Sequence, residues 1–319
     1  MKMKKFIGKF LTALFPLIVY VIFFIIFEPY NYWGLKPFYT GQWTKPLARC
    51  REYMRNSSEN IILGDSRMNH FDLNSVEQMT GERWANLSSG GQQLNLSEEL
   101  FIWANERVPV KNLVIDASFW QMREGSVSPQ ADEVFYIAEH PVEYIFTWDY
   151  AKLAWDEMLS KFDIKEKEEA TQFDPEIEKM IDDDYKYRDD FLEYALYNIR
   201  RGCNNYSIDQ AQIDHIINMV EITKKNGGDV KILIPCVQES IWDYVIEPLE
   251  LEDEIAAYKR KLAKHAVIYD MEWKNELCKQ QDIWGDGFHF KDMEVYRIYT
   301  NELFGETDAN VRVFEEEKE

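Results

Sequence analysis

The sequence predicts an α/β fold with a doubly wound parallel sheet, a mostly helical insertion and one apolar helix at the amino terminus. Three observations predict it. Short apolar runs alternate with amphipathic helical patterns, a long acidic and aromatic segment interrupts that alternation, and an uncharged apolar run lies close to residue 1. The chain has 319 residues, of which 46% are hydrophobic. This excludes a disordered or fibrous protein and suffices for a large buried core.

The amino-terminal apolar run, Phe10–Phe27, contains no charged residue and follows four lysines. A helix needs about 20 residues to span a bilayer, and this run is close to that length. Residues 1–27 are therefore expected to be a cytoplasmic tail and a transmembrane anchor. A cleaved signal peptide is the alternative, but the residues after the run, Glu28–Trp33, offer no small-residue cleavage site. Because lysines stay in the cytoplasm, we expect a single-pass cell-membrane protein whose main domain is extracytoplasmic.

The domain boundaries follow from changes in composition. Residues 28–58 are rich in aromatic residues and proline and are expected to be a juxtamembrane linker, with Tyr30, Tyr32 and Trp33 at the membrane interface. Residues 59–319 are expected to form the extracytoplasmic domain. Within it, residues 119–206 are longer than a βα connection requires, and we expect a mostly helical insertion whose acids form a solvated face, a lid or a partner surface.

Five short apolar runs are typical of buried parallel strands. They are Asn60–Asp65, Arg83–Ser88, Asn112–Ser118, Val230–Cys236 and Ala266–Glu272. Three amphipathic patterns predict helices between and after these strands. They cover Ser207–Asn226, Leu249–His265 and Lys291–Phe304. The first of these is expected to begin with Ser207 as its cap and to end before Gly227.

Charge and cysteine content exclude several function classes. Lysine and arginine number 36 against 57 acids, giving a formal net charge of −21, which argues against binding nucleic acid or anionic lipid head groups through the folded domain. The four cysteines are too few for a disulfide scaffold and match no CxxC motif. Whether they pair is left open. No metal-ligand cluster or phosphate-binding loop stands out, so we expect neither a metal nor another cofactor.

Three motifs lie at expected strand ends or next to the last helix. Leu63-Gly64-Asp65-Ser66-Arg67 follows the first strand, where a serine is exposed at the carboxyl edge of a sheet; a capped Asp-Ser turn is the plainer interpretation. Asn86 to Gly91 follows the second strand, and its paired glycines, Gly90 and Gly91, can present backbone N–H groups to an oxyanion. A flexible turn is the alternative there.

The third motif, Asp286 to His289, can join an aspartate to an imidazole Nδ1 and leave Nε2 free to take a proton from Ser66. His70 is the second candidate for the base. We prefer His289, because a helix after Ser66 would turn His70 away from the substrate.

Together these motifs resemble the SGNH/GDSL hydrolase family over residues 60–118 and 207–305. The resemblance implies a flavodoxin-like sheet with Ser66 as nucleophile, His289 as base and Asp286 as its orienting acid. It places Asp65, Arg67 and the glycines at the oxyanion or substrate site. The family's third block usually reads Gly-x-Asn-Asp, whereas Ile115–Trp120 here contains no asparagine. Asn86 is the candidate substitute donor.

The anchored architecture also resembles the D-alanyl transfer protein of teichoic acid operons and the SGNH partners of membrane-bound O-acyltransferases. That resemblance implies a serine-dependent acyltransferase or esterase that modifies a cell-envelope polysaccharide or teichoic acid-like acceptor, with a membrane-bound O-acyltransferase as a possible partner. Two alternatives remain open: a non-catalytic assembly factor for an acyltransferase or polymer-export complex, and a plain flavodoxin-like binding domain.

Overall fold

The computed structural model describes residues 2–36, 41–162, 190–292, 294–305 and 310–314. The chain divides into two compact units. The first, here called the aromatic unit, consists of Met1–Glu52 and Asp132–Asp174. The second, the sheet unit, consists of Tyr53–Ala131 and Pro175–Glu319.

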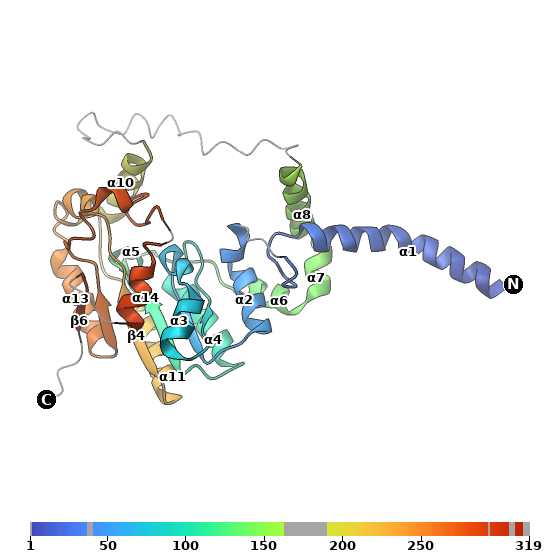
Figure 1. Ribbon diagram of the computed structural model, residues 1–319. Helices are drawn as coiled ribbons and strands as arrows, with labels where there is room; N and C mark the ends of the chain where they lie inside the picture. Colours follow the sequence, from blue (N-terminus) through green and yellow to red (C-terminus); the bar gives the residue numbers. More distant parts are fainter. Residues whose placement is uncertain (1, 37–40, 163–189, 293, 306–309, 315–319) are drawn as a thin grey trace. The chain divides into compact units, whose positions relative to one another are not determined.

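The sheet unit is built on a six-stranded sheet in the order β2-β1-β3-β4-β5-β6 (Figure 1). Its strands are β1 (Asn60–Leu63), β2 (Ala85–Asn86), β3 (Asn112–Asp116), β4 (Asp229–Ile234), β5 (Val267–Asp270) and β6 (Arg312–Phe314). Strands β1 to β5 run parallel, and β6 pairs antiparallel with β5. The five parallel strands coincide with the five apolar runs of the sequence, whereas the edge strand β6 was not predicted.

Helices and short turns connect the strands of the sheet unit. They are η2 (Ser66–His70), α3 (Leu73–Thr80), α4 (Leu94–Asn105), α5 (Phe119–Met122), α10 (Asp190–Cys203), α11 (Gln210–Lys225), α12 (Glu239–Ile241), the π-helical turn η3 (Trp242–Ile246), α13 (Glu252–Ala263), η4 (Gln281–Ile283) and α14 (Arg297–Phe304). The three predicted helices correspond to α11, α13 and α14. The expected cap was wrong, because Asp209 rather than Ser207 accepts the N–H of Ala211, at 2.9 Å.

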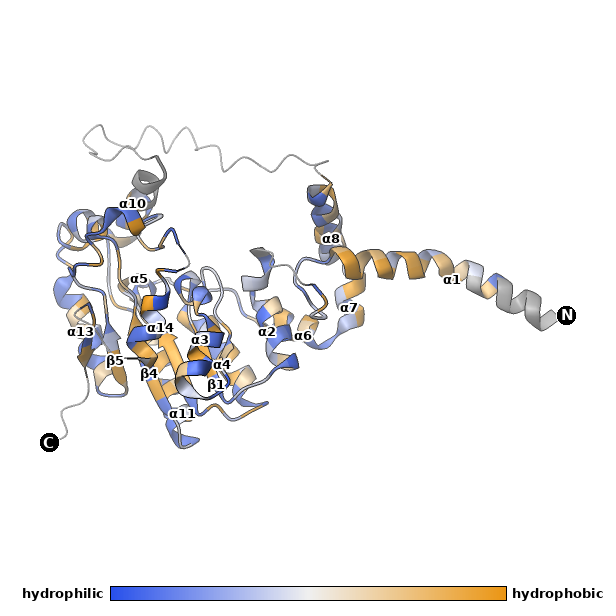
Figure 2. Ribbon diagram, in the orientation of Figure 1, coloured by the Kyte–Doolittle hydropathy of each residue, from blue (hydrophilic) through white to orange (hydrophobic). Residues whose placement is uncertain are grey.

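The core lies on both faces of the sheet. Alternate strand residues Ile62, Val114 and Leu233 belong to one buried cluster with Val76 of α3 and Tyr299 of α14. Since successive strand side chains point to opposite faces, their neighbours point to the other face, where α4, α11 and α13 pack against one another or the sheet. Figure 2 shows β1 and β4 coloured as apolar. Burial on both faces explains why these strands read as unbroken apolar runs.

The aromatic unit corrects the expected linker and the expected insertion. It contains α1 (Lys2–Phe27), η1 (Gly41–Thr44), most of α2 (Pro46–Arg55), α6 (Asp132–Glu139), α7 (Pro141–Phe146) and α8 (Trp148–Lys161). Tyr32 is fully buried and its ring stacks on that of Tyr144 at 4.2 Å. Residues of the expected linker are therefore folded with part of the expected insertion. Residues 163–189 of that insertion lie outside the described residues.

Glu28 is buried at the centre of this aromatic packing. Its carboxylate accepts the N–H groups of Tyr30 and Tyr32, at 2.9 and 3.0 Å, and the hydroxyl of Tyr144, at 2.8 Å. Burial raises the pKa of Glu28, although Lys36 at 3.7 Å and these donors act in the opposite direction. The rings of Tyr30, Tyr32 and Trp33 pack on that of Tyr144 in α7, and their expected position in an interfacial belt stays a prediction.

Among the described residues, no helix is both long enough and apolar enough to cross a membrane. All four cysteines, Cys50, Cys203, Cys236 and Cys278, are buried free thiols.

Candidate active site

Strand β1 delivers Ser66 to the carboxyl edge of the sheet. After β1 ends at Leu63, Gly64 takes a φ of +154°, and Ser66 begins the short helix η2. A Cβ on Gly64 would lie 2.6 Å from a carboxylate oxygen of Asp116 and would also overlap Met68. Glycine is therefore required there by close packing as well as by its backbone angle, and this tight turn positions Ser66.

Ser66, His289 and Asp286 lie together, although they are far apart in the sequence. Ser66 Oγ lies 2.6 Å from His289 Nε2, and His289 Nδ1 lies 2.8 Å from Asp286 Oδ2. The structure thus places His289, rather than the second candidate His70, against the serine. His70 instead packs against the ring of Tyr296 in a tilted arrangement, with ring centroids 4.4 Å apart.

The loop around His289 orients the aspartate. Asp286 Oδ1 accepts the backbone N–H groups of Phe288 and His289, at 2.7 and 2.8 Å. Burial alone would raise the pKa of Asp286, but hydrogen bonding and the charge of His289, with the two N–H groups, bring it below its usual value. The carboxyl is therefore ionised near neutral pH, so it accepts Nδ1–H and leaves Nε2 able to accept the serine proton.

Asp65 and Arg67, which flank Ser66, were predicted to contact substrate or an oxyanion. The structure buries both side chains: Arg67 is 1% exposed, and its Nη2 lies 2.6 Å from Asp65 Oδ2 and donates to Ser118 Oγ at 2.9 Å. Asp116 Oδ2 accepts the backbone N–H of Asp65 at 3.2 Å. Asp65, Arg67 and Asp116, here called the arginine cluster, therefore hold the chain on both sides of Ser66.

The two acids of the arginine cluster have opposite pKa shifts. Burial would raise the pKa of Asp65, but the charge and hydrogen bonds of Arg67 hold it below its usual value. Burial and then the neighbouring charge of Asp65 raise the pKa of Asp116 well above its usual value. Asp65 is thus the ionised partner of Arg67, and Asp116 retains a proton more readily.

The expected oxyanion donor Asn86 has another role. Its Nδ2 donates to the carbonyl oxygen of Met68 at 2.8 Å, and its Oδ1 accepts the N–H of Ser88 at 2.8 Å. Both ends of the amide are engaged, so Asn86 braces η2 against the loop after β2. This brace uses one of the two N–H donors of the Asn86 amide, and its expected role as the substitute for the third-block asparagine stays a prediction.

Gly90 and Gly91 lie exposed in the turn after β2, with Gly91 at a φ of +72°. The N–H of nearby Ser89 donates to the carbonyl of Gly64 at 3.1 Å, which ties this turn to the serine loop. Among the hydrogen bonds between described residues, none uses the N–H of Ser66, Gly90 or Gly91. These groups are the candidate backbone donors for an oxyanion.

The segment after β3, where the family's third block would lie, makes internal contacts instead. Gln121 Nε2 donates to Asp116 Oδ1 at 3.1 Å, while Gln121 Oε1 accepts the N–H of Ser118 at 3.1 Å. The amide of this segment is therefore engaged with the arginine cluster. Sequence reasoning missed the role of Asp116, although its place at the end of an apolar run was a usable signal for a residue at the carboxyl edge.

In the described residues, no group of three or more His, Cys, Asp or Glu side chains is arranged to hold a metal ion. In comparisons with known proteins, neither a family model nor a curated protein matches this chain.

Proposed function

We propose that this protein is a serine-dependent acyl-ester enzyme of the SGNH type, an O-acyltransferase or an esterase. The observation that carries the proposal is the hydrogen-bonded series from Ser66 Oγ through His289 to Asp286, with distances of 2.6 and 2.8 Å. A serine paired with an imidazole whose other nitrogen meets a carboxylate is the arrangement that activates a hydroxyl as a nucleophile.

The mechanism follows from the positions of these atoms. Ser66 Oγ attacks the acyl carbonyl carbon while its proton passes to His289 Nε2, and Asp286 stabilises the imidazolium. The N–H groups of Ser66 and Gly90 are the donors proposed for the oxyanion. When the tetrahedral intermediate collapses, His289 returns the proton to the departing alkoxide, which leaves an acyl ester on Ser66. A water or a sugar hydroxyl then reverses these steps and accepts the acyl group.

The setting of this chemistry is also a proposal: acylation or deacylation of a cell-envelope glycopolymer outside the membrane, with residues 1–27 as the anchor and a membrane-bound O-acyltransferase as partner. Support comes from the uncharged run Phe10–Phe27 and from the exposure of its side chains on α1, including Phe15 at 64% and Ile22 at 53%. Membrane fractionation of cells that produce the full chain tests the anchor. We expect the chain to resist alkaline carbonate extraction, and its release by carbonate would contradict the anchor.

A non-catalytic assembly factor is the second candidate. The specific observation in its favour is that Asn86 and Gln121, the amide side chains beside the serine loop and after β3, are both engaged in internal hydrogen bonds. Loss of one oxyanion donor is worth about 10²–10³ in rate. A protein of this kind would retain the fold without turning over an ester.

Acetylation by p-nitrophenyl acetate separates these two candidates. The full-length chain is mixed with the ester, and acetylated peptides are located by mass spectrometry. We expect acetyl transfer to Ser66, with a rate lowered by about 10³-fold or more in His289→Ala and unchanged in the control His265→Ala. If an added sugar oligomer accelerates loss of the acetyl group from Ser66, that result would favour a transferase over an esterase. A folded chain without acetylation at Ser66 would overturn the enzyme proposal.

A further inference from the structure

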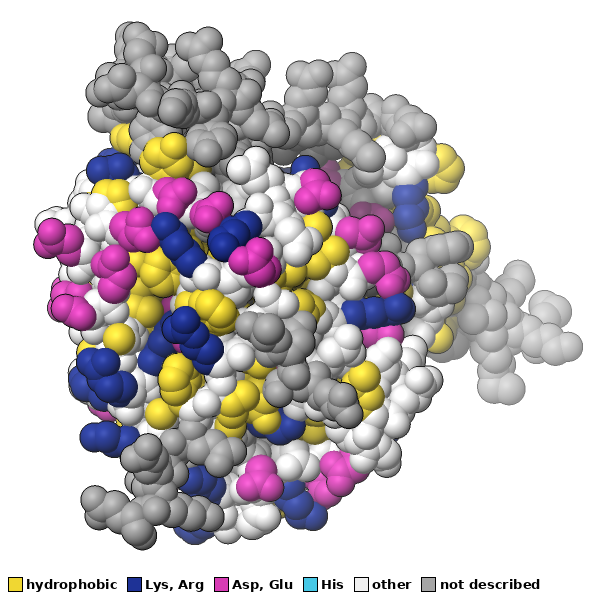
Figure 3. Space-filling model, turned by 60° about the vertical axis from the view of Figure 1, so that its left-hand side comes forward, with side chains coloured by type: hydrophobic (Ala, Val, Ile, Leu, Met, Phe, Trp, Pro, Cys, Tyr) yellow, Lys and Arg dark blue, Asp and Glu magenta, His cyan; other side chains and the backbone are white. Residues whose placement is uncertain are grey.

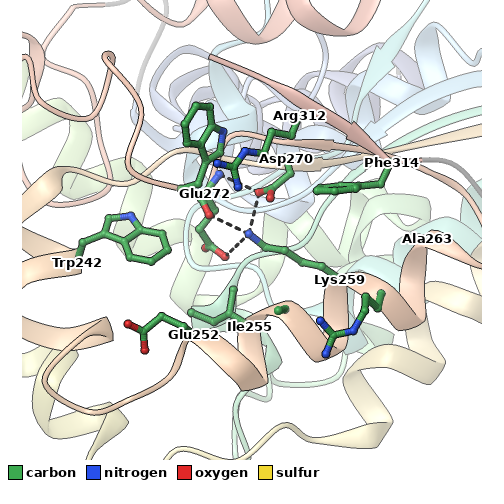
Figure 4. A pocket seen from close by; sticks show the side chains of 12 residues that line it. Trp242, Glu252, Ile255, Lys259, Ala263, Asp270, Glu272, Arg312 and Phe314 are labelled. Carbon is green, nitrogen blue, oxygen red and sulfur yellow. Dashed lines mark hydrogen bonds and ion pairs between the residues drawn. The ribbon is translucent and has the colours of Figure 1, made fainter. Parts of the chain in front are cut away.

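A cavity lies in the sheet unit at the β5–β6 edge of the sheet, whereas Ser66 follows β1 near the opposite edge. The cavity has a volume of about 400 Å³ and lies between η3, α13, β5 and β6. In the strand order, β3 and β4 separate β5 from β1, which carries the serine loop. Figure 4 shows Trp242 and Phe314 on opposite sides of the cavity, with Lys259 between them. Its size falls in the range of small-molecule sites.

The buried acids of the cavity wall are already engaged. Lys259 Nζ lies 2.8 Å from Asp270 Oδ1 and 3.5 Å from Glu272 Oε2. Glu272 also accepts the hydroxyl of Tyr258 at 2.8 Å and the backbone N–H of Phe119 at 3.2 Å. In Lys259, Asp270 and Glu272, here called the lysine cluster, the carboxyl groups are thus engaged by one shared ammonium and are poor partners for a cationic ligand.

Hydrogen-bond donors, in contrast, are left over among the residues that line the cavity. The indole Nε1 atoms of Trp242 and Trp273 are buried and have no acceptor among the described residues. Trp242 is more than nine-tenths buried, with 9% exposure. An unpaired buried donor costs free energy unless a ligand or water accepts from it. Two such donors among the lining residues favour a ligand that supplies acceptor oxygens.

Two guanidinium groups add positive charge to these donors. Arg312 lies over the ring of Trp273 at 3.9 Å, and Arg260 also lines the cavity. Neither guanidinium forms an ion pair with a described carboxylate within 4.0 Å. Figure 3 shows basic side chains beside apolar ones on this side of the molecule, despite the net charge of −21. Of the remaining lining residues, Ile255, Ala256, Ala263 and Phe314 are apolar, and Glu252 adds one acid.

We propose that this cavity binds a small anion that carries an apolar ring or ring face, with a carboxylate or a phosphate as its charged group. The anionic group would accept from Arg312 and the indole N–H groups, because charge-assisted hydrogen bonds to a guanidinium are strong and directional. The ring would pack on the apolar walls. This site is separate from the acyl chemistry proposed at Ser66 and does not depend on it.

Binding of three probes to the full-length chain tests the site: glucuronate, glucose 1-phosphate and uncharged glucose, measured by titration calorimetry and by tryptophan fluorescence. We expect saturable binding of at least one of the two anions and none of glucose up to about 10 mM. The two anionic probes distinguish carboxylate from phosphate recognition. Arg312→Gln is expected to weaken binding about tenfold or more, because it removes the charge and retains much of the side-chain volume.

Two control variants keep the test specific. Arg297→Gln removes an exposed arginine that pairs with Glu294 on the surface and should leave binding unchanged. Ser66→Ala should also leave binding unchanged, because the serine lies near the opposite edge of the sheet. Absence of saturable binding by both anions, equal binding of glucose, or equal loss of binding in Arg297→Gln would overturn the proposal. Loss of binding in Ser66→Ala would place the anion at the serine site and would overturn it too.

Discussion

The arginine cluster and the lysine cluster both stabilise buried carboxyl groups with one cation, but their acids titrate differently. Each places two buried carboxyl groups around one cation near the carboxyl ends of the parallel strands. Arg67 lies 2.6 Å from Asp65, donates to Ser118 and lies 3.9 Å from Asp116. Lys259 is shared by Asp270 and Glu272 at 2.8 and 3.5 Å.

The difference between them lies in how the acids titrate. In the arginine cluster the pKa of Asp65 is lowered and that of Asp116 is raised, so Asp65 loses its proton more readily than Asp116. In the lysine cluster, burial raises the pKa of both Asp270 and Glu272, despite Lys259. The planar guanidinium of Arg67 forms a directional pair with Asp65, whereas the compact ammonium of Lys259 is shared by two acids. The first cluster therefore suits a rigid serine loop, and the second responds to pH.

The largest expected effect comes from removing the arginine. Arg67→Met leaves Asp65 beside buried Asp116 without a cation, and we expect the free energy of unfolding to fall by about 3–5 kcal/mol. Urea titration of the full-length chain measures it. Arg297→Met is the control, since its exposed pair with Glu294 contributes about 0–1 kcal/mol. Equal losses in the two variants would show that the buried cluster has no special role in stability.

Removal of the lysine should depend on pH. A carboxyl whose folded-state pKa is raised binds its proton more tightly when folded. Its contribution to stability is full below the unfolded pKa and is lost as the pH rises through the folded pKa. Asp270 and Glu272 are such groups, and Lys259→Met would raise both pKa values further.

For Lys259→Met, we therefore expect a small loss of stability at about pH 5 that grows by about 1 kcal/mol or more by about pH 8. Urea titrations at both pH values measure the change. Lys261→Met is the control, because its side chain is on the surface and bonds Gln210. A loss that is the same at both pH values would contradict the titration of these two acids.

A loss of stability smaller than that of Arg67→Met is expected at the glycine that faces the arginine cluster. Gly64→Ala forces a Cβ to within 2.6 Å of the Asp116 carboxylate and strains the backbone, so we expect a loss of about 2–3 kcal/mol. Gly125→Ala is matched for positive φ but has open space around its Cβ, and should cost about 1 kcal/mol. Thermal or urea unfolding measures both losses. If Gly64→Ala and Gly125→Ala lower the free energy of unfolding equally, backbone strain alone accounts for the effect at Gly64.

The smallest predicted effect concerns the brace at the serine loop. Asn86→Ala removes hydrogen bonds to Met68 and Ser88, and we expect a loss of about 1–2 kcal/mol. Since its amide is not directed to an oxyanion in our account, acetylation of Ser66 should slow by less than about tenfold. A decrease of 10²-fold or more, measured in a variant that remains folded, would restore Asn86 as an oxyanion donor.

Local patterns were sufficient for the sheet and for part of the site. Buried strands appear as short apolar runs, and Asp286 can be recognised beside His289 because only three positions separate them. The internal contacts of Asp65, Arg67 and Asn86 could not be predicted, since their partners Ser118, Asp116 and Met68 are set by tertiary packing. The packing of residues 28–36 on α7, more than a hundred positions away, likewise leaves no local signal.

The central claim is that His289 activates Ser66. The most direct measurement is the rate at which a fluorophosphonate labels the full-length chain, with the modified residue identified by mass spectrometry. Our account predicts labelling at Ser66 that is abolished in Ser66→Ala and slowed by about 10³-fold or more in His289→Ala. A folded chain that is not labelled, or labelling of Ser66 at the same rate in His289→Ala, would contradict it.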